Sequence, residues 1–366
     1  MGYQGIRNRF QAAATVVGVL VVLGIGAHVL AQTCTPDFLI TPTPNGPQSN
    51  RLNGVVAFDV NDLWAVGFAN GIPFHTSNYQ TLIEHWDGSS WSIVSSPNQG
   101  VSNQLLGVGG IATDDLWAVG YFVEEEGFHP SRTLTLHWDG AQWSVVPSPS
   151  LEGFDQLNAV AAVATDDVWA VGQNWALHSL FLHWDGQAWS IIDGPPNSGG
   201  QNAVAALATD DVWSAGFGEL NHWDGTAWST IPSPPIATLG LSAVASDDVW
   251  ASGFLLHEVC EKSCYNYETP RVLHWDGQSW ATVTDPMGYD AWLTGIAAES
   301  SASVWSVGGE NGHTLAFHWD GSRWTHAPDL QLGGGTSFDG VAVVGGDAWA
   351  VGFAAGRTLA VRFSCN

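Results

Sequence analysis

Basic residues are scarce in this chain. Lys and Arg together number 9, whereas Asp and Glu number 35, and the formal net charge is −26. A surface with this balance repels nucleic acid and anionic membranes. We therefore expect no nucleic-acid partner, and we expect a ligand that is neutral or cationic.

Charged residues of both signs make up only 12% of the chain, while Gly (43) and Trp (21) are abundant. This composition is typical of a compact all-β protein and not of a disordered one. A length of 366 residues would suggest two or three domains. An internal repeat instead indicates one closed domain.

The repeat has a core of the form DxWxxG and a second part of the form HWDGxxW. The core Trp residues are spaced by 53, 52, 44, 37, 55 and 44 residues. A period in this range indicates an array of supersecondary units that bury their apolar faces on one another. The seven core residues are Trp64, Trp117, Trp169, Trp213, Trp250, Trp305 and Trp349.

Each unit predicts four strands, which we call A to D. In residues 157–195, LNAVAAV is strand A, VWAVG strand B, SLFLHW strand C and AWSII strand D. The Asp166-Asp167 pair and the Asp185-Gly186 pair are turn signals between them. Four short antiparallel strands repeated radially predict an all-β, seven-bladed β-propeller.

The seventh unit lacks HWDGxxW and ends near Asn366. Residues 37–44 read DFLITPTP, which matches the D strands WSIVSSP and WSVVPSP. We therefore predict that this N-terminal strand completes the last blade. Closing the ring in this way removes exposed sheet edges.

The first 31 residues differ from the rest. Arg7 and Arg9 precede an uncharged apolar run at 12–31, which is typical of a secretory signal peptide. The run is also long enough to span a bilayer, so an uncleaved signal anchor is the alternative. We expect residues 32–366 to form the propeller, as a monomer that is secreted or held at the cell surface. Any membrane contact would be through the uncleaved segment.

Four cysteines fit export. Cys34 and Cys365 flank the turn that the closed last blade lacks, and their disulfide would contribute about 4–5 kcal/mol in the chain-entropy model. Cys260 and Cys264 would then staple one loop. Four free thiols are the alternative.

Most tryptophans belong to the repeat, because 19 of the 21 occupy its three Trp positions and only Trp175 and Trp292 do not. We expect these 19 to pack between blades. Six repeated histidines, one per blade, cannot converge on a metal, so we expect them to be hydrogen-bonded structural residues. The Asp pairs are expected to be turn formers. We expect no cofactor, and calcium at some of these turns is the alternative.

Function in a repeat protein is expected where the repeats differ. The B–C connections differ most, and those of blades 1, 2 and 5 are long. Aromatic faces with a few polar groups are what a sugar or peptide site needs, although ordinary exposed loops have a similar composition. A histidine metal site is a weaker alternative, since the spacing matches no zinc motif. The candidate ligand-binding residues are Phe74, His75, Tyr79, Glu124, Phe128, His129, Arg132, Trp175, His178, His257, Tyr265, Tyr267, Arg271, His313 and Arg357.

One position near the start of strand A varies among mostly polar residues. We expect it to line the central axis, either as a ligand-binding ring or as hydrogen-bonding residues at a crowded place. We assign it to Asn53, Leu106, Asn158, Asn202, Ser242, Thr294 and Asp339.

The repeats resemble those of secreted bacterial β-propeller proteins with DVWAVG…HWDGxxW units. WDGxxW is similar to a shortened Asp-box of sialidase-like propellers, but it lacks the leading Ser and one residue between Asp and Trp. VWAVG is similar to tectonin-type lectin repeats, and the four-stranded repeat to kelch. The Trp-Asp pair resembles WD40 repeats without their Gly-His element. None of these resemblances implies one function.

Three hypotheses remain. The first is an exported, non-catalytic binding module for an extracellular glycan or protein, held on the face of the B–C loops. The second is a carbohydrate-active lyase or sialidase-like hydrolase, in which Arg132, Arg271 and Arg357 would form a carboxylate-binding triad and Tyr265 or Tyr267 would be the nucleophile. No carboxylate pair has a recognisable glycosidase placement, so we favour the non-enzymatic hypothesis and name no catalytic residue. The third is an architectural envelope or matrix protein.

Overall fold

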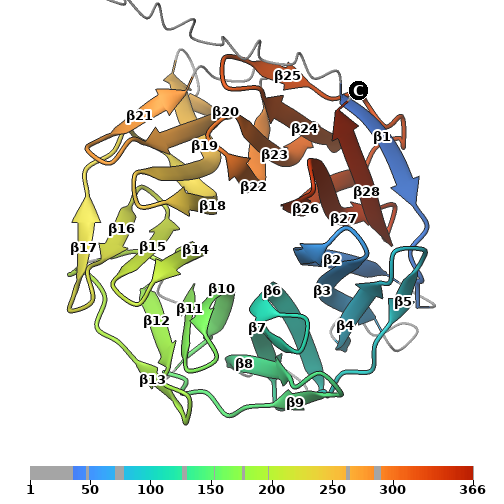
Figure 1. Ribbon diagram of the computed structural model, residues 1–366, viewed down its shortest axis with the longest axis vertical. Coiled ribbons are helices and arrows are strands. Elements are labelled where there is room, and N and C mark those ends of the chain that lie inside the picture. The colour runs from blue at the N-terminus through green and yellow to red at the C-terminus, as the bar shows by residue number, and fades with distance from the viewer. Residues whose placement is uncertain are drawn as a thin grey trace, which may run out of the picture. The chain divides into compact units, whose positions relative to one another are not determined.

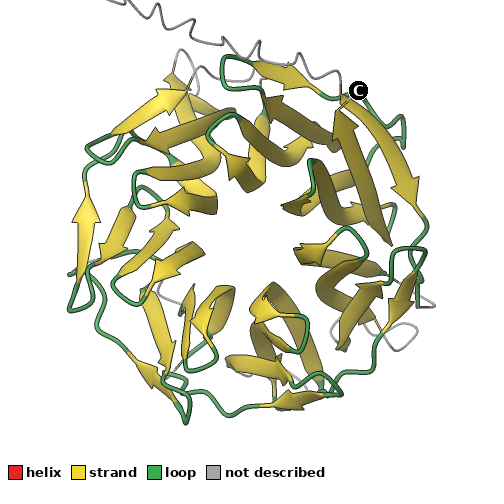
Figure 2. Cartoon of the chain, in the orientation of Figure 1, coloured by secondary structure: helices red, strands yellow, loops and turns green. Residues whose placement is uncertain are grey.

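The computed structural model describes residues 36–46, 49–70, 78–125, 130–151, 153–174, 178–196, 198–260, 264–283 and 290–365. These residues form seven four-stranded antiparallel sheets. Figure 1 shows the sheets arranged as the blades of a ring, and Figure 2 shows strands joined by loops. The predicted seven-bladed propeller is therefore confirmed. Within the described ranges, no helix is long and apolar enough to cross a membrane.

The blades follow one another in chain order. Blade 1 is β2 (Asn50–Asp59), β3 (Asp62–Asn70), β4 (Tyr79–Trp86) and β5 (Trp91–Ile93). Blade 2 is β6 (Ser102–Ala112), β7 (Asp115–Val123), β8 (Ser131–Trp138) and β9 (Trp143–Val145). Blade 3 is β10 (Gln156–Ala164), β11 (Asp167–Gln173), β12 (Ser179–Trp184) and β13 (Trp189–Ile191). Blade 4 is β14 (Gln201–Ala208), β15 (Asp211–Gly216), β16 (Leu220–Trp223) and β17 (Trp228–Ile231).

The last three blades complete the circle. Blade 5 is β18 (Ala237–Ala245), β19 (Asp248–Cys260), β20 (Cys264–Trp275) and β21 (Trp280–Val283). Blade 6 is β22 (Ala291–Ser300), β23 (Ser303–Glu310), β24 (His313–Trp319) and β25 (Trp324–His326). Blade 7 is β26 (Thr336–Val344), β27 (Asp347–Ala354), β28 (Arg357–Cys365) and, from the other end of the chain, β1 (Pro36–Thr41).

Strand β1 closes the ring as predicted. It pairs antiparallel with β28, from Pro36 opposite Cys365 to Thr41 opposite Ala360. The segment that follows β1 repeats contacts that follow the other D strands. Thr43 and Asn45 bond Thr358 of strand C as Ser148 and Ser150 bond Thr133 in blade 2.

Tryptophans from neighbouring blades form the core between the sheets. The indole of Trp117 in blade 2 lies against Trp184 and Trp189 of blade 3, with ring centroids 5.0 and 5.1 Å apart. Such aromatic pairs contribute both buried area and a preferred edge-on geometry. The same contact recurs from blade 1 to 2, 3 to 4, 4 to 5 and 7 to 1. At the blade 6–7 contact Phe363 occupies the strand C position that Trp184 has in blade 3, and its ring stacks on Trp305 with centroids 5.4 Å apart.

The repeated histidines are hydrogen-bonded structural residues, as predicted. In blades 1 to 5 the Nε2 atom lies 2.8–2.9 Å from the carboxylate of the Asp that begins strand B, as in His183 with Asp167. Blade 6 has the weaker pair His318–Ser303 at 3.5 Å. Blade 7 replaces the histidine with Arg362, which bonds Asp347. The second Asp of each pair therefore anchors the histidine of strand C, in addition to the turn-forming role that we expected.

A bulge in strand A joins the inner strands of successive blades. In blades 1, 3, 4 and 6 the residue inside the bulge donates a side-chain hydrogen bond to the backbone of the next blade, as Asn158 Nδ2 does to Gln201 O at 2.8 Å. Asn53, Asn202 and Thr294 do the same with Leu105, Thr238 and Phe338, whereas Asp339 pairs with Arg51. In blades 2 and 5 the residue is a leucine. Of the two roles expected for this position, the structure supports hydrogen bonding at a crowded axis.

One member of that position was assigned wrongly. In blade 5 the bulge lies between Thr238 and Gly240, so its residue is Leu239 and not Ser242. Ser242 instead accepts a hydrogen bond from the backbone of Ala298, in blade 6. The position is defined by the bulge, which only the strand register shows.

The strand register places one of the two predicted cysteine pairs. Cys260 and Cys264 are the last cross-strand partners of the β19–β20 hairpin, and antiparallel partners have Cα separations of about 4.5–5.5 Å, which suit a disulfide. Cys34 lies outside the described residues, although Cys365 is the partner of Pro36. No described cysteine is a free thiol. The pairing stays a prediction.

We expect mass mapping of the unreduced chain to find two linked peptide pairs, Cys34 with Cys365 and Cys260 with Cys264. A reduced sample provides the control, because both pairs must then separate. Recovery of Cys34 or Cys365 as an alkylated thiol from the unreduced protein would show that the ring end has no covalent link.

Two matched hairpin turns predict a change in stability. Asn311-Gly312 in blade 6 and Ala355-Gly356 in blade 7 both have left-handed backbone, with φ of 49° at Asn311 and at Ala355. Asn tolerates this conformation better than Ala. We expect Ala355→Asn to raise the free energy of unfolding by about 0.5–1 kcal/mol, and Asn311→Ala to lower it by a similar amount. Denaturant unfolding of both variants measures this, and equal signs would contradict it.

Candidate functional site

The propeller has two different faces. The A–B and C–D turns form one, which we call the turn face, and the B–C and D–A connections form the other, which we call the loop face. Backbone bonds join the loop-face connections of adjacent blades, as from Asp290 N to Glu268 O and from Asn311 N to Asp290 O. Residues predicted to bind a ligand belong to the loop face.

Among the described residues, the β19–β20 hairpin of blade 5 is the largest departure from the repeat on the loop face. Its strands have 13 and 12 residues, and its pairing continues well beyond Gly253 and Arg271. Figure 1 shows this hairpin as the extension of one blade. We call residues 254–260 and 264–270 the blade 5 arm.

Two of the predicted residues meet on the arm. The rings of His257 and Tyr267 are stacked, with centroids 4.6 Å apart and planes 8° from parallel. His257 Nε2 lies 2.9 Å from the Thr269 hydroxyl. The opposite side of the arm carries Leu256, which is 54% exposed, and Glu268. The arm therefore presents an aromatic side and a side with an exposed aliphatic residue.

Acidic groups lie between the arm and blade 6. Partial burial, assisted by the nearby carboxylate of Asp290, raises the pKa of Glu268 above its ordinary value. A carboxyl with this environment gains from a cation placed beside it, since the cation would offset the repulsion from Asp290.

A pocket of about 210 Å³ lies next along the loop face, in blade 6. Leu315 is buried, whereas His313, His326 and Asp329 are exposed. The pocket contains two acids, two imidazoles and no Lys or Arg. It can hold a cationic or neutral polar group. Its lining residues are Glu310, Asn311, His313, Thr314, Leu315, His326 and Asp329.

Of these lining residues, only His313 was predicted from the sequence to bind a ligand. His326 was passed over because it lies in strand D and not in a B–C connection, but the end of that strand also reaches the loop face. Glu310 and Asp329 lie at or near short connections of blade 6, whereas the prediction concentrated on the long B–C connections of blades 1, 2 and 5. Position at the loop-face end of a strand is a signal that could have identified Glu310 and His326. Asp329 lies in the D–A connection, and no sequence signal pointed to it.

The other predicted residues are spread around the rim. In blade 1 the ring of Tyr79 lies 4.7 Å from Phe68, and burial together with Tyr79 raises the pKa of Tyr121 in blade 2. In blade 2 Arg132 and Glu124, each about half exposed, form an ion pair at 3.0 Å. His178 in blade 3 bridges to Gly199.

Some predicted residues cannot be placed. Those outside the described residues are Phe74, His75, Phe128, His129 and Trp175, and for Tyr265 only the backbone in β20 is described.

The three arginines of the sialidase-like alternative do not form a triad. Arg132, Arg271 and Arg357 belong to β8, β20 and β28, which Figure 1 shows in separate sectors of the ring. Arg132 pairs with Glu124, and Arg271 donates to Pro235 O at 3.1 Å. The geometry therefore gives no support to a shared carboxylate site.

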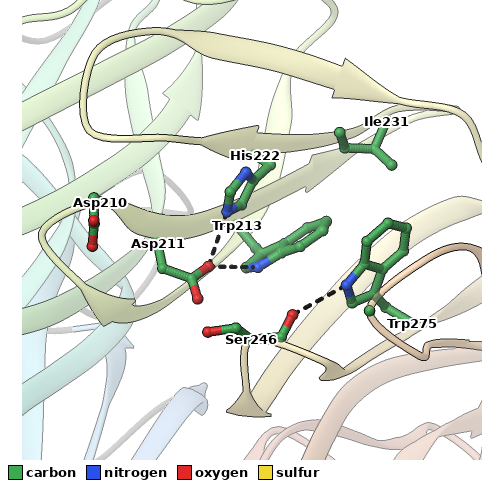
Figure 3. Close-up of a pocket in the computed structure, with 8 residues that line it drawn as sticks. Asp210, Asp211, Trp213, His222, Ile231, Ser246 and Trp275 are labelled. Carbon is green, nitrogen blue, oxygen red and sulfur yellow. Dashed lines mark hydrogen bonds and ion pairs between the residues drawn. The ribbon is translucent and has the colours of Figure 1, made fainter.

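A second pocket, of about 330 Å³, lies on the turn face between blades 4 and 5. Figure 3 shows His222 and Trp213 both directed at the carboxylate of Asp211, and Trp275 directed at the backbone oxygen of Ser246. The same residue types make the same bonds in other blades, as His183 and Trp184 do with Asp167 and Thr165 O. These polar groups serve the packing of the repeat, and we do not assign a ligand to them.

Metal binding finds no support in the described part of the chain, where no three His, Cys, Asp or Glu side chains are grouped so that they could hold an ion. The C–D turn carboxylates are instead used locally. Hydrogen bonds from Ser89 and Ser90 lower the pKa of Asp87 to about 2, and bonds from Thr226 and Ala227 do the same for Asp224.

No family model matches the chain, and no curated protein matches it. Solved structures do. The structure of YCF48 bound to D1 peptide has a TM-score of 0.59 and 14% identity, covering 91% of this chain and 96% of that one. YCF48 from Cyanidioschyzon merolae has a TM-score of 0.54 and 15% identity, covering 89% and 98%. The WD40 propeller domain of Doa1 has a TM-score of 0.56 and 14% identity, covering 89% and 97%. At these identities the likeness shows the fold alone, and a fold by itself does not imply a function.

Proposed function

We propose that this chain is an exported, non-catalytic binding module that holds an extended, cationic segment of a partner protein on its loop face. The observation that carries the proposal is the asymmetry of that face. Blade 5 extends an arm with an exposed Leu256, and the adjoining blade 6 has an acidic pocket. The turn face, in contrast, repeats the same bonds from blade to blade.

Charge supports a cationic ligand. The chain has 35 acidic and 9 basic residues, and complementary charge both steers and selects a partner. The pocket contains Glu310 and Asp329. Backbone hydrogen bonds from Asn311 to Asp290 and from Asp290 to Glu268 connect the pocket with the arm. A Lys or Arg side chain would fill this pocket with its apolar stem against Leu315 and its charged end among the carboxylates.

A structural neighbour supports a peptide as the ligand. One of the similar solved structures is YCF48 bound to D1 peptide, so a ring of this shape can hold a polypeptide segment. A glycan is the second candidate, because Tyr267 and His257 offer stacked rings of the kind that sugar sites use. Export is proposed from the apolar segment at 12–31 and the four cysteines.

A binding assay tests the proposal. The chain spanning residues 32–366 is immobilised and offered arrays of cationic, anionic and neutral peptides and a panel of polysaccharides, with released sugar measured in the same wells. We expect retention of cationic peptides that weakens as salt rises. Retention of polysaccharide without peptide would favour the glycan, and released sugar would overturn the non-catalytic assignment.

Matched charge variants locate the site. Removing two carboxylates from the pocket, with Glu310→Gln and Asp329→Asn, is expected to weaken binding of the retained peptide about tenfold, or about 1.4 kcal/mol. The control, Asp210→Asn with Glu299→Gln, removes two carboxylates from the turn face. Equal losses in the two double variants would show that the net charge acts without a site on the loop face.

A further inference from the structure

The contact between blades 1 and 7 is the seam at which the two ends of the chain close the ring. Glu84, on β4 of blade 1, lies in this seam and is 0% exposed. Its cross-strand partner on β3 is Ala65, a member of the buried cluster that also contains Leu82, Trp91 and Trp349. A carboxyl group is therefore enclosed among apolar side chains of two blades.

The same position is apolar in most other blades. The residues opposite the equivalent strand B positions are Leu136, Leu182, Leu273, Phe317 and Val361. In blade 4 it is Asn221, whose amide bonds Gln201 and Ser214. Glu84 has no such arrangement, since neither of its oxygens has a partner in hydrogen-bonding geometry. An acid thus replaces an apolar residue only at the seam.

Polar groups of the closing segment lie against Glu84. The hydroxyl of Thr358 on β28 is its polar neighbour, and that hydroxyl also bonds Thr43 and Asn45, which follow β1. Trp91 of blade 1 donates its indole N–H to Thr41 of β1 at 3.1 Å. The carboxyl is therefore in contact with the bonds that hold the N-terminal strand in place.

No cation on the surrounding strands is placed to neutralise Glu84 within the described residues. Arg51 on β2 is paired with Asp339 on β26, and Arg362 on β28 with Asp347 on β27. Arg357 and Asp37 are exposed. The other titratable side chains on these strands are Asp59 and Asp62 on β2 and β3, and Tyr79 and His85 on β4.

We propose that Glu84 makes the seam a pH-sensitive latch, which holds β1 in the ring while the carboxyl is protonated and loosens when it ionises. An ionised carboxylate in this place has neither water nor a counter-ion, so the folded seam must open or admit water. The other blade contacts contain no buried acid at this position, so we expect their stability not to change with pH in this way.

The direction follows from proton binding. Burial raises the pKa of Glu84 from 4.5 to about 8, and the Thr358 hydroxyl offsets part of this rise. Between these two values the folded chain holds the proton and the unfolded chain does not, so the free energy of unfolding falls as pH rises. The stabilisation is full below the ordinary pKa, is lost through the interval up to about pH 8 and then levels off.

Hydrogen exchange tests the latch in the whole chain. Exchange of the segment 36–46 is compared with that of 143–151, the equivalent D strand of blade 2, in the same sample, so that the intrinsic effect of pH on exchange cancels. Between about pH 6 and about pH 9 we expect the protection of 36–46 to fall about tenfold or more relative to 143–151.

Variants decide whether Glu84 is the cause. Glu84→Leu restores the residue of blades 2, 3 and 5, and Glu84→Gln keeps the shape without a titratable group. Both should abolish the relative loss of protection, while the exposed control Glu299→Gln should retain it. Persistence of the loss in the Leu or Gln variant, or equal exchange of the two segments at all pH values in the unmodified chain, would overturn the proposal.

Discussion

Each blade buries its central tryptophan against the following blade and not within itself. Trp117 is 2% exposed because Trp184 and Trp189 of the next blade cover it. A single blade, or an open row of blades, would leave one such surface in water at each end. Closure of the ring is therefore a requirement of the packing, and strand β1 from the opposite end of the chain meets it.

Blade 7 and its seam with blade 1 meet this requirement with exceptions to the repeat. Blade 7 has Phe363 and Arg362 where the other blades have Trp and His, and Phe363 packs against blade 6. At the seam Asp339 is paired with Arg51, where blades 1, 3 and 4 use an amide and a backbone oxygen. Glu84 is the least conventional of these substitutions, because it places an ionisable group in an apolar contact. These departures from the repeat lie where the two chain ends meet. A blade contact that contains an ionisable residue can respond to pH, whereas the apolar contacts of the other blades do not.

The two faces follow from the same geometry. The His–Asp pairs lie on the turn face beside the A–B turns, so the residues of that face are held by the needs of packing. The loop face carries the B–C and D–A connections, and surface connections of this kind can vary in length without disturbing the core. The blade 5 arm and the acidic pocket of blade 6 are both of this kind.

The repeat, the number of blades, the strands of each blade and the closing strand could all be predicted from the chain, because tryptophan spacing and turn residues are local signals that recur seven times. The structural role of the histidines was also predictable, although their partners were not, since the Asp of strand B and the His of strand C meet only when the strands pair. The loop-face site was predictable only as a set of candidates. Arg132, Arg271 and Arg357 look alike in sequence, yet the ring places them in three different blades, whereas His313 and His326 come from separate strands to one pocket. Which blade surface Glu84 faces was likewise decided by the tertiary structure, because burial depends on the neighbour that covers a strand and not on the strand itself.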